Sequence, residues 1–115
     1  MQNNEIPTYS LNDFSNMRKA GALAASILDE LKELIEPGVS TLEINDFCHN
    51  KIIQSNAIPA PLNYKGFPKS ICTSLNHVVC HGIPSQNKIL QDGDIINIDV
   101  TAIVNGWHGD TSRMF

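Results

Sequence analysis

Two aspartates near the carboxyl end of the chain, Asp99 and Asp110, are the residues best suited to chemistry. They lie within residues 94–115, a segment whose other residues are largely apolar and β-branched and so predict strand. Carboxylates in apolar surroundings need a cation, a basic partner or a proton, because an isolated charge is costly to bury. Two of them on one strand face are typical of a site that shares one or two divalent cations.

The turn between the two aspartates decides how they face each other. Asn105 and Gly106 tolerate the positive φ of a type I′ turn, so the sequence predicts a β-hairpin with a two-residue loop. The predicted cross-strand pairs are Val104 with Trp107, Ala102 with Gly109, Thr101 with Asp110, and Asp99 with Ser112. Asp99 and Asp110 are then diagonal neighbours on one face, with Cβ atoms about 7 Å apart. A three-residue loop with a bulge would break this register, and the sequence leaves that alternative open.

Strand alternation separates the predicted hairpin into two faces. One carries Asn97, Asp99, Thr101, His108, Asp110 and Ser112, and the other carries Ile96, Ile98, Val100, Ala102 and Val104. The apolar face predicts packing on a hydrophobic layer. The polar face has two interpretations, a solvated outer surface or a half-buried cation site. Ile95 and Ile103 share it and favour partial burial.

Two helices are expected before the strands. Ser10 followed by Asp13 predicts a helix start, and an apolar side at three- and four-residue steps continues to the break at Pro37-Gly38. That side consists of Phe14, Met17, Gly21, Ala24, Leu28, Leu31 and Ile35, which we expect to face the core. Ser40 with Glu43 predicts a capping box and a second helix to about Ser55.

The segment between the helices and the hairpin predicts loops and one broken strand. A loop begins at Ile58-Pro59, and its residues Tyr64 and Phe67 either line a pocket or cover the core. Strand is expected around Ile71, Thr73, Val78 and Val79, interrupted at 74–76, and residues 85–94 are expected to be exposed loop. His81, followed by Gly82 and Pro84, is well placed to project into a cleft.

Bulk properties indicate one small globular unit. The 115 residues carry a formal net charge of -4 with scattered lysines and arginines, which gives no reason to expect a nucleic-acid partner. No segment predicts a membrane span, and the first residues lack the basic and apolar regions of a signal peptide, so the expected location is the cytoplasm. Cys48, Cys72 and Cys80 are odd in number and fit reduced thiols.

Four blocks in order resemble the type I methionine aminopeptidases of bacteria. They are residues 64–70 (Tyr-Lys-Gly-Phe-Pro-Lys-Ser), 78–84 (Val-Val-Cys-His-Gly-Ile-Pro), 97–101 (Asn-Ile-Asp-Val-Thr) and 106–112 (Gly-Trp-His-Gly-Asp-Thr-Ser). The resemblance runs from about Ser10 to Phe115 and opens directly on the first helix, as in the short bacterial form. It implies an α/β (α+β) fold, the N-terminal half of the pita-bread fold, with residues 1–115 as a single partial domain.

The resemblance also implies roles for particular residues. Asp99 matches a bidentate ligand of one metal, Asp110 matches the carboxylate that bridges two, and His81 matches the catalytic histidine that contacts substrate. Tyr64, Phe67 and Cys72 match the methionine side-chain pocket, and Asn97 with Val100 match an accessory monovalent-cation site. The same resemblance implies two divalent ions (Co, Mn, Fe or Zn) as cofactors and the N-termini of nascent polypeptides as substrates. It also implies the ribosome as a partner and a monomeric complete enzyme.

The chain departs from that pattern in one large way. It stops at Phe115, within what should be a continuing strand, and the family's other ligands, a histidine and two glutamates, have no counterpart. His108 is a candidate stand-in, although hairpin packing is the favoured interpretation. Pro61, Phe67 and His77 also differ from many relatives. We therefore expect a truncated form with little activity alone; the alternatives are a non-catalytic half-fold that binds peptide N-termini or a partner, and an X-Pro-type peptidase relative.

Overall fold

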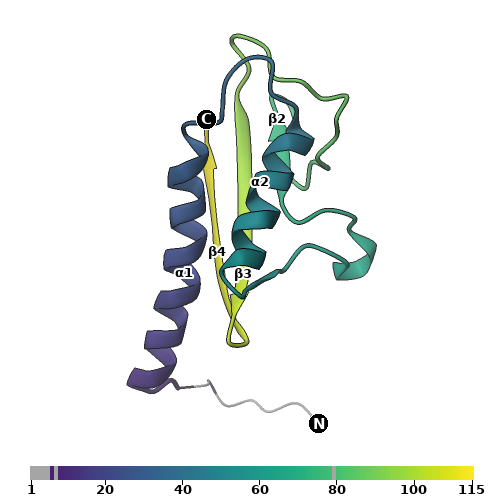
Figure 1. Ribbon diagram of the computed structural model, residues 1–115. Helices are drawn as coiled ribbons and strands as arrows, with labels where there is room; N and C mark the ends of the chain where they lie inside the picture. Colours follow the sequence, from purple (N-terminus) through teal and green to yellow (C-terminus); the bar gives the residue numbers. More distant parts are fainter. Residues whose placement is uncertain (1–5, 7, 79) are drawn as a thin grey trace.

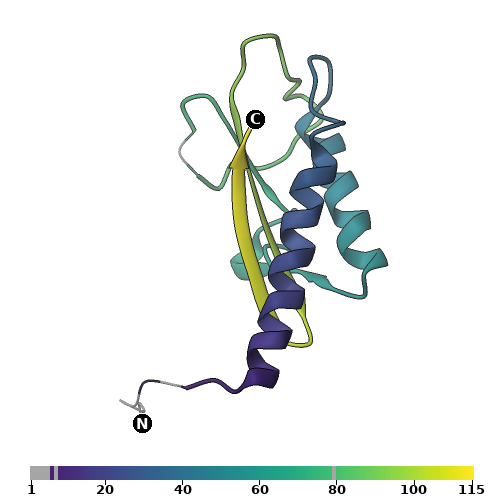
Figure 2. The same ribbon diagram turned by 90° about the vertical axis from the view of Figure 1, so that its left-hand side faces the viewer.

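A computed structural model describes residue 6, residues 8–78 and residues 80–115. These form helices α1 (Leu11–Leu31) and α2 (Thr41–Gln54), a 3₁₀ turn η1 (Tyr64–Gly66), and strands β1 (Ile58–Pro59), β2 (Cys72–Leu75), β3 (Ile96–Val104) and β4 (Trp107–Met114). Figures 1 and 2 show both helices on one face of the sheet, with the loop that carries η1 beyond its other side. The layered α+β arrangement agrees with the predicted fold class.

Strand β3 organises the antiparallel sheet. It pairs with β4 along one edge and with β1 and β2 along the other, so each end of β3 lies between two neighbours. Its alternate residues Ile96, Ile98, Val100 and Ala102 are at most 1% exposed and pack under the helices. The core face predicted for the hairpin is therefore confirmed, and the opposite face is left free for the site.

Helix α1 begins where predicted and ends earlier. The Ser10 and Asp13 side chains form the reciprocal hydrogen bonds of a capping box, which satisfies the first free N–H groups. The helix ends at Leu31 and not at Pro37-Gly38, because Gly38 and Val39 hydrogen-bond to Leu90 and draw the chain into another segment. Its apolar side is only partly buried: Phe14 and Met17 are 42% and 40% exposed, since the first turns extend past the hairpin tip (Figure 1).

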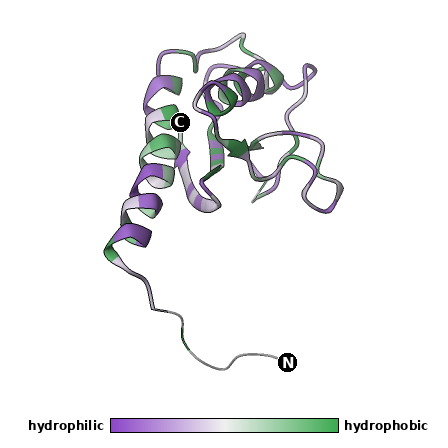
Figure 3. Cartoon of the chain, turned by 60° about the horizontal axis from the view of Figure 1, so that its bottom comes forward, coloured by the Kyte–Doolittle hydropathy of each residue, from purple (hydrophilic) through white to green (hydrophobic). Residues whose placement is uncertain are grey.

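The close packing of α1 on β4 depends on Gly109. A Cβ atom built on Gly109 would lie 2.2 Å from the carbonyl carbon and oxygen of Ala20. The helix backbone therefore rests directly on the strand, and only glycine leaves the room. Figure 3 shows hydrophilic residues along the outward side of α1, as expected for a helix that covers a sheet.

The middle of the chain differs from the prediction in two places. Ile58 and Pro59 are not loop but a short edge strand that pairs with β3. Strand β2 continues through Ser74, where an interruption was expected, because its residues pair with β3 from Cys72 to Leu75. Val78 lies in a turn that closes on Leu75, and Val79 is outside the described residues. Helix α2 has the predicted bounds to within a residue, with Ser40 as its N-cap.

Candidate metal and peptide site

The hairpin has the predicted register. Val104 pairs with Trp107, Thr101 with Asp110 and Asp99 with Ser112, and the turn residues Asn105 and Gly106 have φ angles of 52° and 82°. This confirms the two-residue loop and excludes the bulged alternative. Asp99 and Asp110 are therefore diagonal neighbours on the face turned away from the helices.

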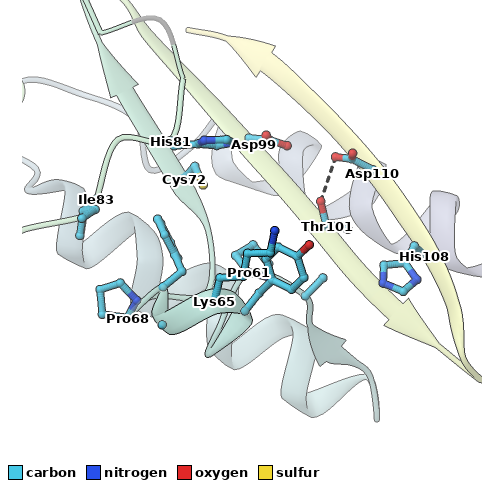
Figure 4. A pocket seen from close by; sticks show the side chains of 14 residues that line it. Pro61, Lys65, Pro68, Cys72, His81, Ile83, Asp99, Thr101, His108 and Asp110 are labelled. Carbon is cyan, nitrogen blue, oxygen red and sulfur yellow. Dashed lines mark hydrogen bonds between the residues drawn. The ribbon is translucent and has the colours of Figure 1, made fainter.

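A cavity of about 910 Å³ opens on that face. Its walls come from the hairpin, from β2 and the segment after it, and from the loop around η1 (Figure 4). The lining residues are Ala60, Pro61, Tyr64, Lys65, Gly66, Phe67, Pro68, Cys72, His81, Ile83, Asp99, Thr101, His108 and Asp110. The volume is in the range of small-molecule sites, and mixed apolar walls with a few convergent polar groups are typical of them.

The two carboxylates influence each other. Partial burial raises the pKa of Asp99 above its ordinary value, the charge of Asp110 raises it further, and His81 opposes the rise. Asp110 is more exposed and accepts a hydrogen bond of 2.9 Å from the Thr101 hydroxyl, which holds its carboxylate across the two strands. Such a pair gains most from a cation, because a cation stabilises both ionised forms at once.

His81 reaches the cavity through a compact backbone path. It has a positive φ of 56°, and the next residue, Gly82, lies flat against β2 with its carbonyl 2.9 Å from the Thr73 N–H and its own N–H 3.2 Å from the Ser74 hydroxyl. A Cβ on Gly82 would be 1.9 Å from the Thr73 carbonyl oxygen, so the glycine is required there. Figure 4 shows the imidazole beside Asp99 and Cys72. The sequence signal, a histidine before glycine and proline, correctly indicated a side chain that projects into a cleft.

The apolar part of the cavity is built by the η1 loop and the start of β2. Tyr64 and Phe67 line it, and the Phe67 N–H donates to the Tyr64 carbonyl at 2.9 Å, which closes the loop. Cys72 lines the cavity and is paired with Asp99 on the neighbouring strand. Burial, and secondly the charge of Asp99, raise the pKa of its thiol to about 11. The thiol is therefore neutral near pH 7 and acts as a small apolar wall.

Two residues suggested for a monovalent-cation site are not in the cavity. Asn97 shares the carboxylate face, yet its amide donates to the Met114 sulfur at 3.3 Å. The Val100 side chain is fully buried on the opposite face, and its backbone pairs with Thr111 in the sheet. The assignment of Asn97 and Val100 stays a prediction.

Some members of the site were missed or misjudged from the sequence. His108 is exposed and lines the cavity, so its favoured interpretation as hairpin packing is wrong. Ile103 is its cross-strand neighbour, and the His108 side chain is still exposed to solvent. Ile95 is 53% exposed, and burial of the carboxylate face at that end is likewise wrong. The role of Thr101 as a hydrogen-bond donor to Asp110 was recoverable from the predicted register, in which the two residues are directly opposed.

The donor set suits hard divalent cations but is incomplete. Within the described ranges, no group of three or more histidine, cysteine, aspartate or glutamate side chains is placed to hold a metal ion. Asp99 and Asp110 offer at most four carboxylate oxygens, which fit Mn²⁺, Fe²⁺, Co²⁺ or Zn²⁺ in part. Tight binding of two ions requires further ligands.

The family follows from the comparison with known protein families. Residues 15–115 match the model of metallopeptidase family M24. The chain belongs to this family. Its M24 membership implies divalent-metal use, which agrees with the paired carboxylates, and the resemblance noted in the four sequence blocks is confirmed.

The M24 chain is similar in sequence and in structure to the methionine aminopeptidase of Rickettsia prowazekii. It is 62% identical over 110 residues to the methionine aminopeptidase of Rickettsia prowazekii, an alignment that covers 96% of the chain and 42% of that protein. The crystal structure of a methionine aminopeptidase from Rickettsia prowazekii superposes with a TM-score of 0.93 at 61% identity, and again 96% of the chain covers 44% of the other. The chain thus spans less than half the length of the curated relatives it matches. The predicted partial pita-bread fold is confirmed.

A solved structure of much lower sequence identity also superposes on the chain. An Xaa-Pro dipeptidase from Bacillus anthracis superposes with a TM-score of 0.73 at 18% identity. At that level of identity the likeness shows the fold alone. Among the described helices, none is both long and apolar enough to cross a membrane.

Proposed function

We propose that this chain supplies the hairpin carboxylates and the substrate pocket of a metalloaminopeptidase that removes the initiator methionine from new polypeptides. One observation carries the proposal: Asp99, Asp110 and His81 share a cavity with the apolar group Tyr64, Phe67 and Cys72. Cation ligands, a hydrogen-bond donor and a side-chain pocket in one enclosure are what cleavage after a single apolar residue needs.

Asp99 and Asp110 would hold divalent ions, Mn, Fe, Co or Zn, through their carboxylate oxygens. Bound ions would supply Lewis-acid activation of water and of the peptide carbonyl, and an anchor for the free amino terminus. Thr101 keeps the Asp110 carboxylate in place through its 2.9 Å hydrogen bond. Because the chain spans 42% of its Rickettsia relative, the remaining ligands lie outside these residues in our proposal.

The other residues act on the peptide. His81 donates a hydrogen bond to charge that develops at the first peptide bond, which lowers the barrier where that charge is greatest. Tyr64, Phe67 and Cys72 surround the methionine side chain. The backbone near Asn97 and Val100 would take a monovalent cation. The expected setting is the cytoplasm, with nascent-chain N-termini and the ribosome as partners and a monomeric complete enzyme.

The first test concerns completeness. The 115-residue chain, assayed with Mn²⁺ or Co²⁺ on Met-Ala-Ser, should release essentially no methionine, because two carboxylates cannot hold the full centre. Robust turnover by the chain alone would contradict the incomplete-site proposal.

The second test restores the missing ligands. Residues 1–115 replace the matching part of the Rickettsia prowazekii enzyme, with which they are 62% identical, and the chimera should cleave Met-Ala-Ser. In it, Asp99→Asn and Asp110→Asn should abolish turnover, and Thr101→Val should weaken metal affinity about tenfold, as expected for loss of a ligand-orienting hydrogen bond. Ser112→Ala, on the same face but outside the cavity, is the matched control and should retain activity. Equal loss in the control, or none in the aspartate variants, contradicts the assignment.

A non-catalytic role is the second candidate. In the described part of the chain, β4 pairs only with β3, and Met114 at its end is 54% exposed. An unpaired edge with apolar ends favours association with a partner strand. Size-exclusion chromatography distinguishes the cases, because a well-behaved monomer counts against a partner-binding half-fold.

A further inference from the structure

Lys65 gives the cavity a positive wall that none of the proposed roles uses. Among the described residues that line the cavity it is the only lysine or arginine. Figure 4 shows Lys65 on the loop side of the cavity, with Asp99 and Asp110 on the strand side. The two kinds of charge therefore lie on opposite walls.

The loop holds Lys65 in a conformation that lysine rarely adopts. Lys65 has φ 47° and ψ 37°, and its neighbours Asn63 and Gly66 have φ angles of 66° and 80°. The loop is closed by hydrogen bonds from the Asn63 N–H to the Phe67 carbonyl at 2.8 Å and from the Phe67 N–H to the Tyr64 carbonyl at 2.9 Å. A left-handed backbone is unfavourable for a residue other than glycine, so the hydrogen bonds of the loop must hold Lys65 in this conformation.

The ammonium group lies near an aromatic ring, and it forms no ion pair with a carboxylate of the residues that the structure describes. The Lys65 Nζ lies 5.5 Å from the centroid of the Tyr64 ring, within the range of a cation–π contact. Within the ranges that the structure describes, the salt bridges join Lys51 to Glu30 and Arg113 to Asp29. The charge of Lys65 is therefore available to a ligand in the cavity, whereas the two aspartates are committed to cations in the proposed function.

We propose that Lys65 is a specificity-determining residue that favours peptides with acidic side chains shortly after the first residue. The proposal rests on the proposed function, because it takes the first side chain to lie among Tyr64, Phe67 and Cys72 with the amino terminus at Asp99 and Asp110. The peptide beyond the first bond then passes the exposed wall. Glutamate or aspartate there meets the Lys65 ammonium, and lysine or arginine is repelled.

The expected effect is modest because Lys65 is exposed to solvent. Exposed ion pairs change equilibria by about 0.2–1 kcal/mol, so we expect an affinity difference of about 1.4- to fivefold between acidic and neutral peptides. The difference should shrink in about 0.5 M NaCl, since salt screens charges that face water.

Binding to the full 115-residue chain tests this without turnover. The probes are Met-Ala-Glu-Glu-Ser, Met-Ala-Gln-Gln-Ser and Met-Ala-Lys-Lys-Ser, each with a fluorophore at the carboxyl end, and the readout is fluorescence anisotropy in buffer with Mn²⁺. The wild type should bind in the order acidic, neutral, basic. Lys65→Gln should remove the order, and Lys65→Glu should reverse it. Lys69→Glu is the matched control, because Lys69 is on the same segment and does not line the cavity, and it should keep the wild-type order.

The outcomes separate this inference from the proposed function. N-acetylated versions of the three peptides test the need for a free amino terminus. If acetylation prevents binding, then equal affinity for the three free peptides, or an order that Lys65→Glu leaves unchanged, overturns the role of Lys65 alone. A charge order that survives acetylation overturns the proposed function and leaves Lys65 as a charge selector. Failure of every peptide to bind at millimolar concentration overturns the inference.

Discussion

Replacement of Gly109 by alanine tests how the helix layer positions the carboxylate face of the hairpin. The added Cβ would lie 2.2 Å from the carbonyl carbon and oxygen of Ala20 and 2.6 Å from the Gly21 nitrogen. These distances are shorter than ordinary van der Waals contact by about 1 Å, and the atoms met are backbone, which cannot rotate away. Helix α1 and strand β4 must therefore separate, and Asp110, the next residue on β4, moves with the strand.

The size of the effect follows from that geometry. Overpacking of a filled core costs about 1–3 kcal/mol, and a backbone-on-backbone clash belongs at the upper end, so we expect a loss near 3 kcal/mol in the free energy of unfolding. For a chain of this size, that loss lowers Tm by roughly 10 °C or more. Metal affinity should fall as well, because the Asp110 carboxylate shifts relative to Asp99.

Urea denaturation followed by circular dichroism measures the change in the free energy of unfolding. Gly21→Ala is the control on the same interface: a Cβ on Gly21 meets nothing within 4 Å, and alanine is favoured over glycine inside a helix by about 1 kcal/mol. The two glycine-to-alanine changes should therefore have opposite signs. A Gly109→Ala variant as stable as the wild type would refute the direct helix-on-strand packing.

Two further predictions concern buried groups. Cys80 is exposed and should react quickly with a thiol reagent at pH 8. Burial raises the pKa of Cys48 from 9.0 to about 12 and that of Cys72 to about 11, so their thiolate populations and labelling rates should be lower by about a hundredfold or more until urea unfolds the chain. Equal labelling rates for all three cysteines in the folded chain would contradict this packing. Asn45→Ala should lower the free energy of unfolding by about 2 kcal/mol in the same denaturation assay. The side-chain oxygen Oδ1 of Asn45 accepts from the backbone N–H groups of Ser70 at 2.9 Å and Ile71 at 3.3 Å, and the substitution would leave both buried without a partner. Asn50→Ala, at an exposed position of the same helix, should change little, and a similar loss in both variants would count against the hydrogen-bond explanation.

The local part of the site could be predicted because its causes are local. The register that makes Asp99 and Asp110 neighbours follows from the two-residue Asn105-Gly106 turn and from strand alternation, and both act over a few residues. The capping serines Ser10 and Ser40 likewise begin helices for reasons contained in one turn. These features needed no knowledge of the rest of the chain.

Predictions failed where distant segments compete for the same backbone. The end of α1 is decided by hydrogen bonds of Gly38 and Val39 to Leu90, and the extent of β2 by its pairing with β3. Neither partner can be read from the local sequence. The apolar pattern that continues beyond Leu31 therefore predicted too long a helix α1, and the polar residues at 74–76 predicted too short a strand β2.

The amino-acid sequence by itself determined the register of the hairpin, its carboxylate pair and the family to which the chain belongs. Only the tertiary structure decided what surrounds that pair: the glycine contact that seats α1 on β4, and the cavity that brings His108 and Lys65 to the same enclosure. The physical reason is distance along the chain. Turns and strand alternation are set by neighbouring residues, whereas the walls of a cavity are set by segments that meet only after the helices and the sheet have packed.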